Sequence, residues 1–291
     1  MVGALVAALA AAGCIALRTT VARRAERAYA TRRPPGEDGI VPGAEGFTLP
    51  GTNGRALLMF HGSGDTPQTL RYLGERLHEA GFTVRAPLLP GHGRGLRDFA
   101  TVSAEAYFRT ARKELEQLRA TSGWVSVVGL SMGGAIAARL AAENEDIRAL
   151  VLLAPYLTPT RSVDLVGRAS TLCSLALPYL GGRGGESSIH DPVARGESYA
   201  YGVFPPRAVR ALVDTAAAAR RALPAVTAPT LVVNSREDNR IPWRLADTAT
   251  ATLRAPTERH WVAGCGHVIT VDYRRDAVAA LVLDFIARHA D

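Results

Sequence analysis

The feature that most constrains the fold is the alternation of short apolar runs with helix-like segments from about residue 55 onward. Five segments have the pattern of buried strands: 56–60, 82–89, 125–130, 149–153 and 230–234. Runs of this kind are typical of parallel strands that are covered on both faces. Helix-like patterns separate them, as where Leu70, Leu73 and Leu77 recur at helical spacing. The alternation predicts an α/β fold with a mostly parallel sheet and helices on both faces.

One stretch of about 70 residues, between positions 155 and 229, lacks any buried-strand pattern. It contains helix-like segments at 163–180 and 206–223, and a structureless connection of that length is uncommon inside a compact domain. We therefore expect a helical cap over residues 156–224, inserted into a core made of residues 55–155 and 225–291. The cap offers apolar side chains for a pocket: Val163, Leu165, Val166, Leu172, Leu175 and Leu177.

The N-terminal segment differs in composition from the rest. Residues 1–17 contain no charged side chain and would extend roughly 25 Å as a helix, whereas the arginines follow from Arg18 to Arg33. By the positive-inside rule this predicts a membrane anchor at 1–33 with a cytoplasmic catalytic domain. A cleaved signal of a secreted protein remains an alternative. A lipoprotein is another, because Ala-Ala-Gly-Cys14 resembles a lipobox. The Pro- and Gly-containing stretch 34–54 is predicted to be an exposed linker.

Charge and cysteine content exclude several function classes. The formal net charge is +7, but residues 18–33 hold +5 of it, so no basic face spans the folded part and no nucleic acid partner is expected. The three cysteines are too widely spaced for a disulfide framework or a zinc pattern. No metal and no cofactor is implied, because the chain also lacks a phosphate- or dinucleotide-binding glycine loop. The sequence leaves the oligomeric state open.

The segment Gly129-Leu130-Ser131-Met132-Gly133 matches the G-x-S-x-G pattern at a change from strand to helix. A nucleophile on such a sharp turn needs glycines two residues to either side, so that strand and helix can pack closely. Ser131 is the candidate nucleophile. The Met132 amide is a candidate oxyanion donor, because it lies at a helix N-terminus.

Partners for that serine occur in the expected order along the chain. Asp238 follows a buried strand, and His267 lies in a glycine-flanked loop before the last helix. A serine hydroxyl needs a base that is itself oriented by an acid, which are the roles expected of His267 and Asp238. Upstream, His61-Gly62-Ser63 follows the first strand, and the Ser63 amide is the second candidate oxyanion donor.

Other residues could fill the same roles. Glu237 is an alternative acid, and His61 and His92 are alternative bases. We favour a positioning role for His61 at the oxyanion loop and a structural role for His92 in its Pro-Gly-His-Gly turn. Asp272 is expected to hold the loop after His267 by hydrogen bonding.

These motifs resemble the α/β-hydrolase superfamily over residues 54–291, and more narrowly the bacterial carboxylesterase and monoacylglycerol lipase group. The resemblance rests on four segments: His61-Gly62, APLLPGHG at 86–93 with His92, GLSMGG at 129–134 and GHVITVD at 266–272. It implies a serine hydrolase that cleaves carboxylic esters, of short to medium acyl chains or of monoacylglycerol, through an acyl-enzyme. Many relatives have a bulky apolar residue after the His-Gly pair, where this chain has Ser63.

Two other classes of function stay open at this point. The same triad serves thioesterases, acyltransferases and peptidases, and position in the sequence does not separate them. An anchored domain of this fold could also be a binding module that has lost its chemistry. Labelling by a serine-directed phosphonate would distinguish the second case.

Overall fold

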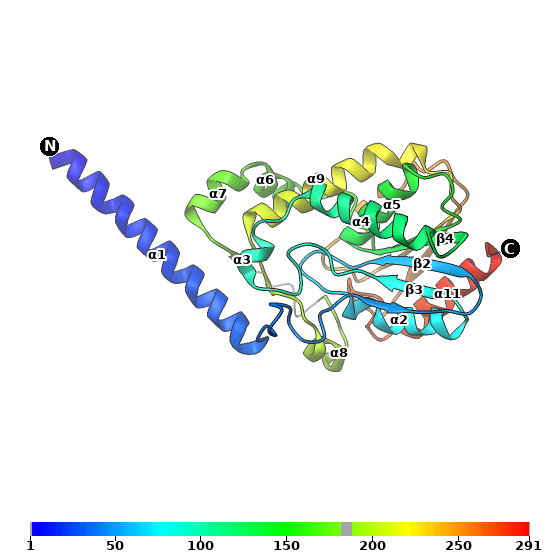
Figure 1. The fold of residues 1–291 in the computed structure, drawn as a ribbon. Coiled ribbons are helices and arrows are strands. Elements are labelled where there is room, and N and C mark those ends of the chain that lie inside the picture. The colour runs from blue at the N-terminus through cyan, green and yellow to red at the C-terminus, as the bar shows by residue number, and fades with distance from the viewer. Residues whose placement is uncertain (1, 182–187, 291) are drawn as a thin grey trace.

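The computed structural model describes residues 2–181 and 188–290, and its centre is a seven-stranded sheet (Figure 1). The strand order is β1-β3-β2-β4-β5-β8-β9. The bounds are β1 Phe47–Leu49, β2 Arg55–Phe60, β3 Thr83–Ala86, β4 Trp124–Leu130, β5 Leu150–Leu153, β8 Thr230–Ser235 and β9 Thr257–Val262. Only β1 runs antiparallel to its neighbour. The predicted mostly parallel sheet is therefore confirmed.

Helices cover both faces of this sheet (Figure 1). On one face lie α2 (Gln68–Glu79) and α11 (Arg275–Arg288), and on the other α4 (Ala104–Arg119), α5 (Met132–Ala142) and α9 (Pro206–Ala222). Strand β2 shows why, since its apolar residues alternate between the two layers. Leu58 and Phe60 pack in the core beneath α4 and α5, and Leu57 and Met59 in the core beneath α2 and α11.

Within residues 156–181 and 188–224 the structure describes four helices and a short two-stranded sheet. These are α6 (Arg161–Arg168), α7 (Ser170–Ala176), β6 (Leu180–Gly181), α8 (Pro192–Glu197), β7 (Val203–Phe204) and α9. Helix α9 touches both α6 and α5, and its residues Ala211 and Ala219 are buried in the same core cluster as Ile136 of α5. Helix α9 thus joins this segment to the core. Three further short helices are α3 (Leu96–Phe99), η1 (Leu223–Ala225) and α10 (Trp243–Ala249).

The prediction of an exposed linker at 34–54 is wrong between residues 41 and 49. Val41 and Ala44 are buried, and Phe47–Leu49 forms edge strand β1 against β3. A three-residue edge strand contributes too few apolar residues to stand out from a loop, so only its pairing with β3 reveals it.

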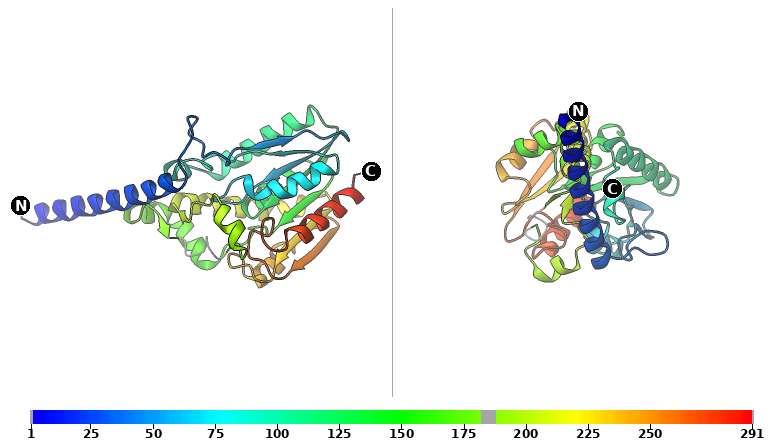
Figure 2. Two further views of the ribbon diagram at one scale, coloured as in Figure 1. Left: turned by 90° about the horizontal axis from the view of Figure 1, so that it is seen from below. Right: turned by 90° about the vertical axis from the view of Figure 1, so that its left-hand side faces the viewer.

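Residues Val2–Arg32 form one helix, α1, which extends away from the rest of the molecule (Figures 1 and 2). Its C-terminal end is attached through the Tyr29 ring, 4.8 Å from that of Tyr201, and through Glu26, which accepts hydrogen bonds from Arg97 and Tyr179. Within the described residues, no helix combines the length and the apolar character needed to cross a bilayer.

Candidate active site

Ser131 occupies the sharp turn between β4 and α5. Its backbone has φ 54° and ψ −116°, a left-handed region that non-glycine residues rarely adopt. The turn is held by a bond from the Ser131 amide to the Leu153 carbonyl, 2.9 Å long. A Cβ added to Gly129 would lie 2.2 Å from the Gly133 carbonyl oxygen, and one added to Gly133 would lie 2.0 Å from that of Phe60. Both glycines are therefore required by close backbone approach.

Three side chains from separate loops meet at this turn. His267 Nε2 lies 2.8 Å from Ser131 Oγ, and His267 Nδ1 lies 2.7 Å from Asp238 Oδ2. Asp238 lies on the loop after β8, and His267 on the loop between β9 and α11. All three side chains are largely buried. The structure thus brings the predicted serine, histidine and acid into one hydrogen-bonded chain.

The Asp238 carboxylate is fixed on both of its oxygens. Oδ1 accepts hydrogen bonds from the amides of Arg240, at 2.7 Å, and Ile241, at 2.8 Å, which leaves Oδ2 for His267. Burial alone would raise the pKa of Asp238, but the charge and hydrogen bond of His267, together with the two amides, hold it below its usual value. Asp238 is therefore ionised at neutral pH and fixed in position beside the imidazole.

The loop that carries His267 is held by Asp272. Its buried carboxylate accepts bonds from the amides of Gly266 at 2.7 Å, His190 at 2.8 Å, and Asp191 and Tyr273 at 2.9 Å. Burial acts to raise the pKa of Asp272, but these amides together lower it. The structure thus gives Asp272 the contacts expected of a residue that holds this loop.

Glu237, the alternative acid, and His61 and His92, the alternative bases, make contacts with groups other than Ser131. Glu237 is exposed and accepts a bond from the Gly264 amide, 2.8 Å away. The ring nitrogens of His61 are bonded to Gly62 O and the Leu89 amide, and those of His92 to Pro90 O and the Gly64 amide. Burial lowers the pKa of His61 well below its usual value and that of His92 to about 4, so both rings are neutral at pH 7.

Those two histidines hold the loop on either side of Ser63. Nδ1 of His61 lies 2.9 Å from the Gly62 carbonyl, and Nε2 of His92 accepts from the Gly64 amide at 3.0 Å. Gly62 lies directly against Ser131, since a Cβ built on it would be 3.4 Å from the serine Cβ. Within residues 2–181 and 188–290, no protein acceptor is found for the amides of Ser63 and Met132. These amides are consequently available to a ligand at Ser131.

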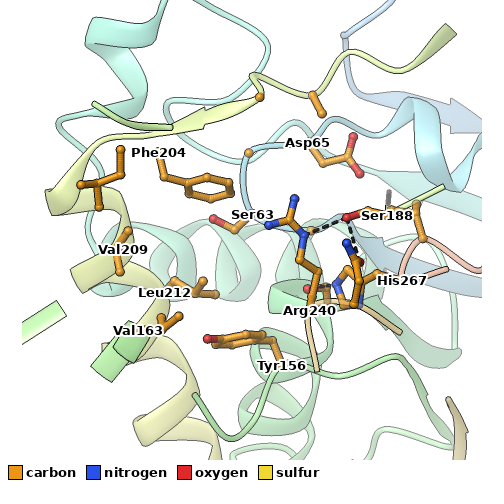
Figure 3. Close-up of a pocket in the computed structure, with 18 of the residues that line it drawn as sticks. Ser63, Asp65, Tyr156, Val163, Ser188, Phe204, Val209, Leu212, Arg240 and His267 are labelled. Atoms are coloured by element: carbon orange, nitrogen blue, oxygen red, sulfur yellow. Dashed lines mark hydrogen bonds between the residues drawn. The ribbon is translucent and has the colours of Figure 1, made fainter. Parts of the chain in front are cut away.

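A cavity of about 460 Å³ opens at Ser131 and His267, between the core loops and residues 156–224 (Figure 3). Its apolar lining, here called the apolar wall, includes Tyr156, Val163, Val166, Phe204, Val209 and Leu212. Its polar lining, here called the polar wall, includes Ser63, Asp65, Ser188, Asn239 and Arg240. The cavity can therefore hold an amphipathic molecule with its polar part on the His267 side.

The expectation that six cap residues line the pocket is wrong for four of them. Val163 and Val166 line the cavity, whereas Leu165, Leu172, Leu175 and Leu177 are 67, 70, 71 and 51% exposed. Val163 and Val166 are three residues apart on one face of α6, whereas no residue of α7 lines the cavity. The spacing of apolar residues does not reveal which helix of the segment meets the cavity.

Apart from Ser63, the residues of the polar wall were not predicted from the sequence. Asp65 lies in the cavity, where burial raises the pKa of its carboxyl to about 6. Arg240 gave a weak signal, as a basic residue two positions after the candidate acid on a loop at the carboxyl end of a strand. The direction of its side chain is set by tertiary contacts.

Comparison with known proteins agrees with this geometry. The family model for serine aminopeptidase, S33, matches residues 52–274. The thermostable monoacylglycerol lipase of Bacillus sp. (strain H-257) is 29% identical over 256 residues, which cover 86% of this chain and 97% of the relative. The carboxylesterase of Bacillus subtilis (strain 168) is 28% identical over 247 residues, covering 83% of this chain and 96% of the relative.

Solved structures show the same fold. A structure from a study of LipS and LipT, two metagenome-derived lipolytic enzymes, superposes with a TM-score of 0.79 at 27% identity and covers 86% of this chain and 100% of its own. The monoacylglycerol lipase of Paleococcus ferrophilus, at 18% identity, shares the fold with a TM-score of 0.73 and covers 84% of this chain and 98% of its own. The chain therefore belongs to the serine aminopeptidase S33 family of α/β-hydrolases and is a hydrolytic enzyme related to carboxylesterases and monoacylglycerol lipases.

Proposed function

We propose that the protein hydrolyses carboxylic esters through an acyl-enzyme on Ser131. In this mechanism Ser131 Oγ attacks the ester carbonyl while His267 Nε2, 2.8 Å away, takes its proton. Asp238 keeps the imidazole in the required tautomer and stabilises the imidazolium that forms. The hydrogen-bonded chain from Ser131 to Asp238 is the observation that carries the proposal.

The tetrahedral intermediate places a negative charge on the former carbonyl oxygen. The amides of Ser63 and Met132 would bind that oxyanion, and a single donor of this kind typically contributes about 3 kcal/mol. His267 then protonates the leaving alcohol. Water, activated by the same histidine, releases the acid and regenerates Ser131.

The substrate class is proposed from the cavity and from the relatives. The apolar wall can hold an acyl chain, and a cavity of about 460 Å³ suits short to medium chains or a monoacylglycerol. The Bacillus relatives, named as a monoacylglycerol lipase and a carboxylesterase, support this range.

Hydrolysis of p-nitrophenyl esters from acetate to palmitate by the full chain tests the proposal, with Ser131→Ala in parallel. We expect a maximum at short or medium chains that disappears in the variant. Hydrolysis retained by pure Ser131→Ala would contradict the assignment. If the wild type is inactive but reacts with a fluorophosphonate, thioesters and aminoacyl amides are the next substrates. A wild type that does not react would indicate a binding module.

We also infer that the enzyme associates with a membrane through its N-terminal helix. Ile15 and Leu17 of α1 are exposed, and the Arg18 side chain donates a 2.9 Å bond to the Ser174 carbonyl of α7. This contact ties α7 to α1 (Figure 1), and Leu172 and Leu175 of α7 are exposed. The arginines after residue 17 support a cytoplasmic orientation of the catalytic domain.

Vesicle flotation of the full chain tests this inference. Leu172→Asp on α7 is expected to weaken binding to phosphatidylglycerol vesicles, whereas Val193→Asp, an equally exposed residue on α8, should not. Equal binding by both variants and the wild type would show that α7 does not contact the membrane. Intact mass of the cell-derived protein distinguishes an anchor from a cleaved or lipidated N-terminus.

A further inference from the structure

The polar wall contains the guanidinium of Arg240, which forms no ion pair within the described residues. Arg240 Nε donates a 2.8 Å bond to Ser188 Oγ, and Figure 3 shows the rest of the guanidinium reaching into the cavity. Within the part of the chain that the structure describes, Arg240 forms no ion pair, and its two terminal nitrogens have no hydrogen-bond partner. Several donors therefore point into the cavity.

The nearby carboxylates do not supply a partner. Asp238 already accepts bonds from His267 and from the amides of Arg240 and Ile241. Asp65, on the same wall, accepts a 2.9 Å bond from the Thr66 amide and forms no ion pair with Arg240. Arg240 is partly buried, and this burial lowers the pKa of its guanidinium although the charge of Asp238 acts to raise it. A partly desolvated cation of this kind is stabilised when an anion binds beside it.

The position of Arg240 indicates which part of a substrate it meets. In the proposed reaction His267 protonates the leaving alcohol, so the alcohol lies on the His267 side of the ester. Arg240 lies beside His267 in the cavity, away from most of the apolar wall (Figure 3). A planar guanidinium matches carboxylate and phosphate groups, which it can bind with two parallel hydrogen bonds.

We propose that Arg240 is a specificity-determining residue that binds an anionic group, a carboxylate or a phosphate, on the alcohol portion of the ester. This inference rests on the proposed esterase function. It makes the preferred substrate an acyl ester of a hydroxy acid or of a hydroxyalkyl phosphate, with the acyl chain against the apolar wall. Hydrolysis would then release the free acid and an anionic alcohol.

Matched ester pairs test this proposal on the full chain. The carboxylate pair is 4-(butanoyloxy)butanoate and its neutral amide, and the phosphate pair is 2-(butanoyloxy)ethyl phosphate and 2-hydroxyethyl butanoate. Release of butanoate gives kcat/KM for each ester. We expect the wild type to prefer the anionic member of at least one pair by about tenfold or more, the size of one charge-assisted hydrogen bond. The pair with the larger ratio identifies the anion.

Two variants assign the preference to Arg240. Arg240→Met should reduce the ratio to about one, and Arg240→Lys should retain part of it. Arg236→Met is the matched control, because it removes the same charge from the same loop. The Arg236 side chain is exposed and stacks on Trp261 outside the cavity, so its loss should leave the ratio unchanged. Labelling of Ser131 by a fluorophosphonate shows that each variant is folded.

The outcomes separate the two proposals. Neutral esters hydrolysed through Ser131 with no anionic preference in either pair would overturn the role of Arg240 and leave the esterase function intact. A preference that survives in Arg240→Met would overturn it as well. A preference seen only when the carboxylate is on the acyl chain, as in monopropyl glutarate, would overturn the assignment to the alcohol. Absence of any ester hydrolysis would overturn both proposals.

Discussion

The Nδ1 atom of His267 lies 2.7 Å from Oδ2 of Asp238, although the two residues come from different loops of the sheet. Two backbone amides hold the other oxygen of Asp238, so the carboxylate cannot rotate away from the imidazole without losing them. This contact decides which ring nitrogen carries the proton and leaves Nε2 free to face Ser131.

Asp238→Asn is accordingly expected to lower kcat for ester hydrolysis by about three to four orders of magnitude while the fold is kept, because an amide favours the wrong imidazole tautomer. Steady-state kinetics with a p-nitrophenyl ester measures the loss. Glu237→Gln is the matched control, since Glu237 is the adjacent exposed carboxylate and contacts the Gly264 amide and His190 rather than the His267 ring. Equal losses in both variants would contradict the role of Asp238.

Strand β4 and helix α5 approach closely at Ser131, so adding one methyl group at Gly133 is expected to reduce stability strongly. In Gly133→Ala the new Cβ would lie 2.0 Å from the Phe60 carbonyl oxygen, so β2 and α5 must separate. We expect a loss of about 3 kcal/mol or more in the free energy of unfolding, measured by urea denaturation. Gly123→Ala has no atom within 4 Å of its new Cβ and should change stability by about 0.5 kcal/mol or less.

Val166 of α6 lines the apolar wall, so a larger side chain there is expected to change the preference for acyl-chain length. Val166→Trp places a bulky ring at the apolar wall and should lower kcat/KM for p-nitrophenyl octanoate about tenfold relative to the acetate. Its neighbour Leu165 is 67% exposed, so Leu165→Trp should leave the chain-length profile unchanged. Identical profiles for the two variants would show that acyl chains bind elsewhere.

Because Asp65 is buried, its ionisation is expected to make the stability of the folded protein depend on pH. Because its pKa is raised to about 6 by burial, the native state favours the protonated acid. The stability that Asp65 contributes is present below its unfolded pKa and is lost as pH rises through about 6. The free energy of unfolding of Asp65→Asn minus that of the wild type should therefore increase by about 2 kcal/mol from pH 4 to pH 8.

Urea denaturation of both proteins at pH 4, 6 and 8 measures this difference. A difference that is constant with pH would show that Asp65 titrates normally in the folded protein.

The sequence was informative where a segment is buried on both sides. Strands β2, β4, β5 and β8 were predicted because continuous apolar runs are rare outside doubly covered strands. Strands β1 and β9 were missed, since both lie at sheet edges. The β9 segment Thr-Glu-Arg-His-Trp-Val is half-exposed and mixes polar with apolar residues, so only its pairing with β8 identifies it.

The candidate site shows the same limit. Ser131, Asp238 and His267 could be proposed because each follows a recognisable element in a fixed order along the chain. The residues that line the cavity could not be predicted, because the lining depends on the direction of side chains that come from distant segments. Val166 and Leu165 are adjacent in the sequence, yet only the first meets the cavity.

The most direct test of the central claim is peptide mass spectrometry of the full chain after reaction with a fluorophosphonate. The account predicts one adduct, on Ser131, that is absent in Ser131→Ala and forms much more slowly in His267→Ala. Labelling of another residue, or an unmodified Ser131 in folded wild-type protein, would contradict it.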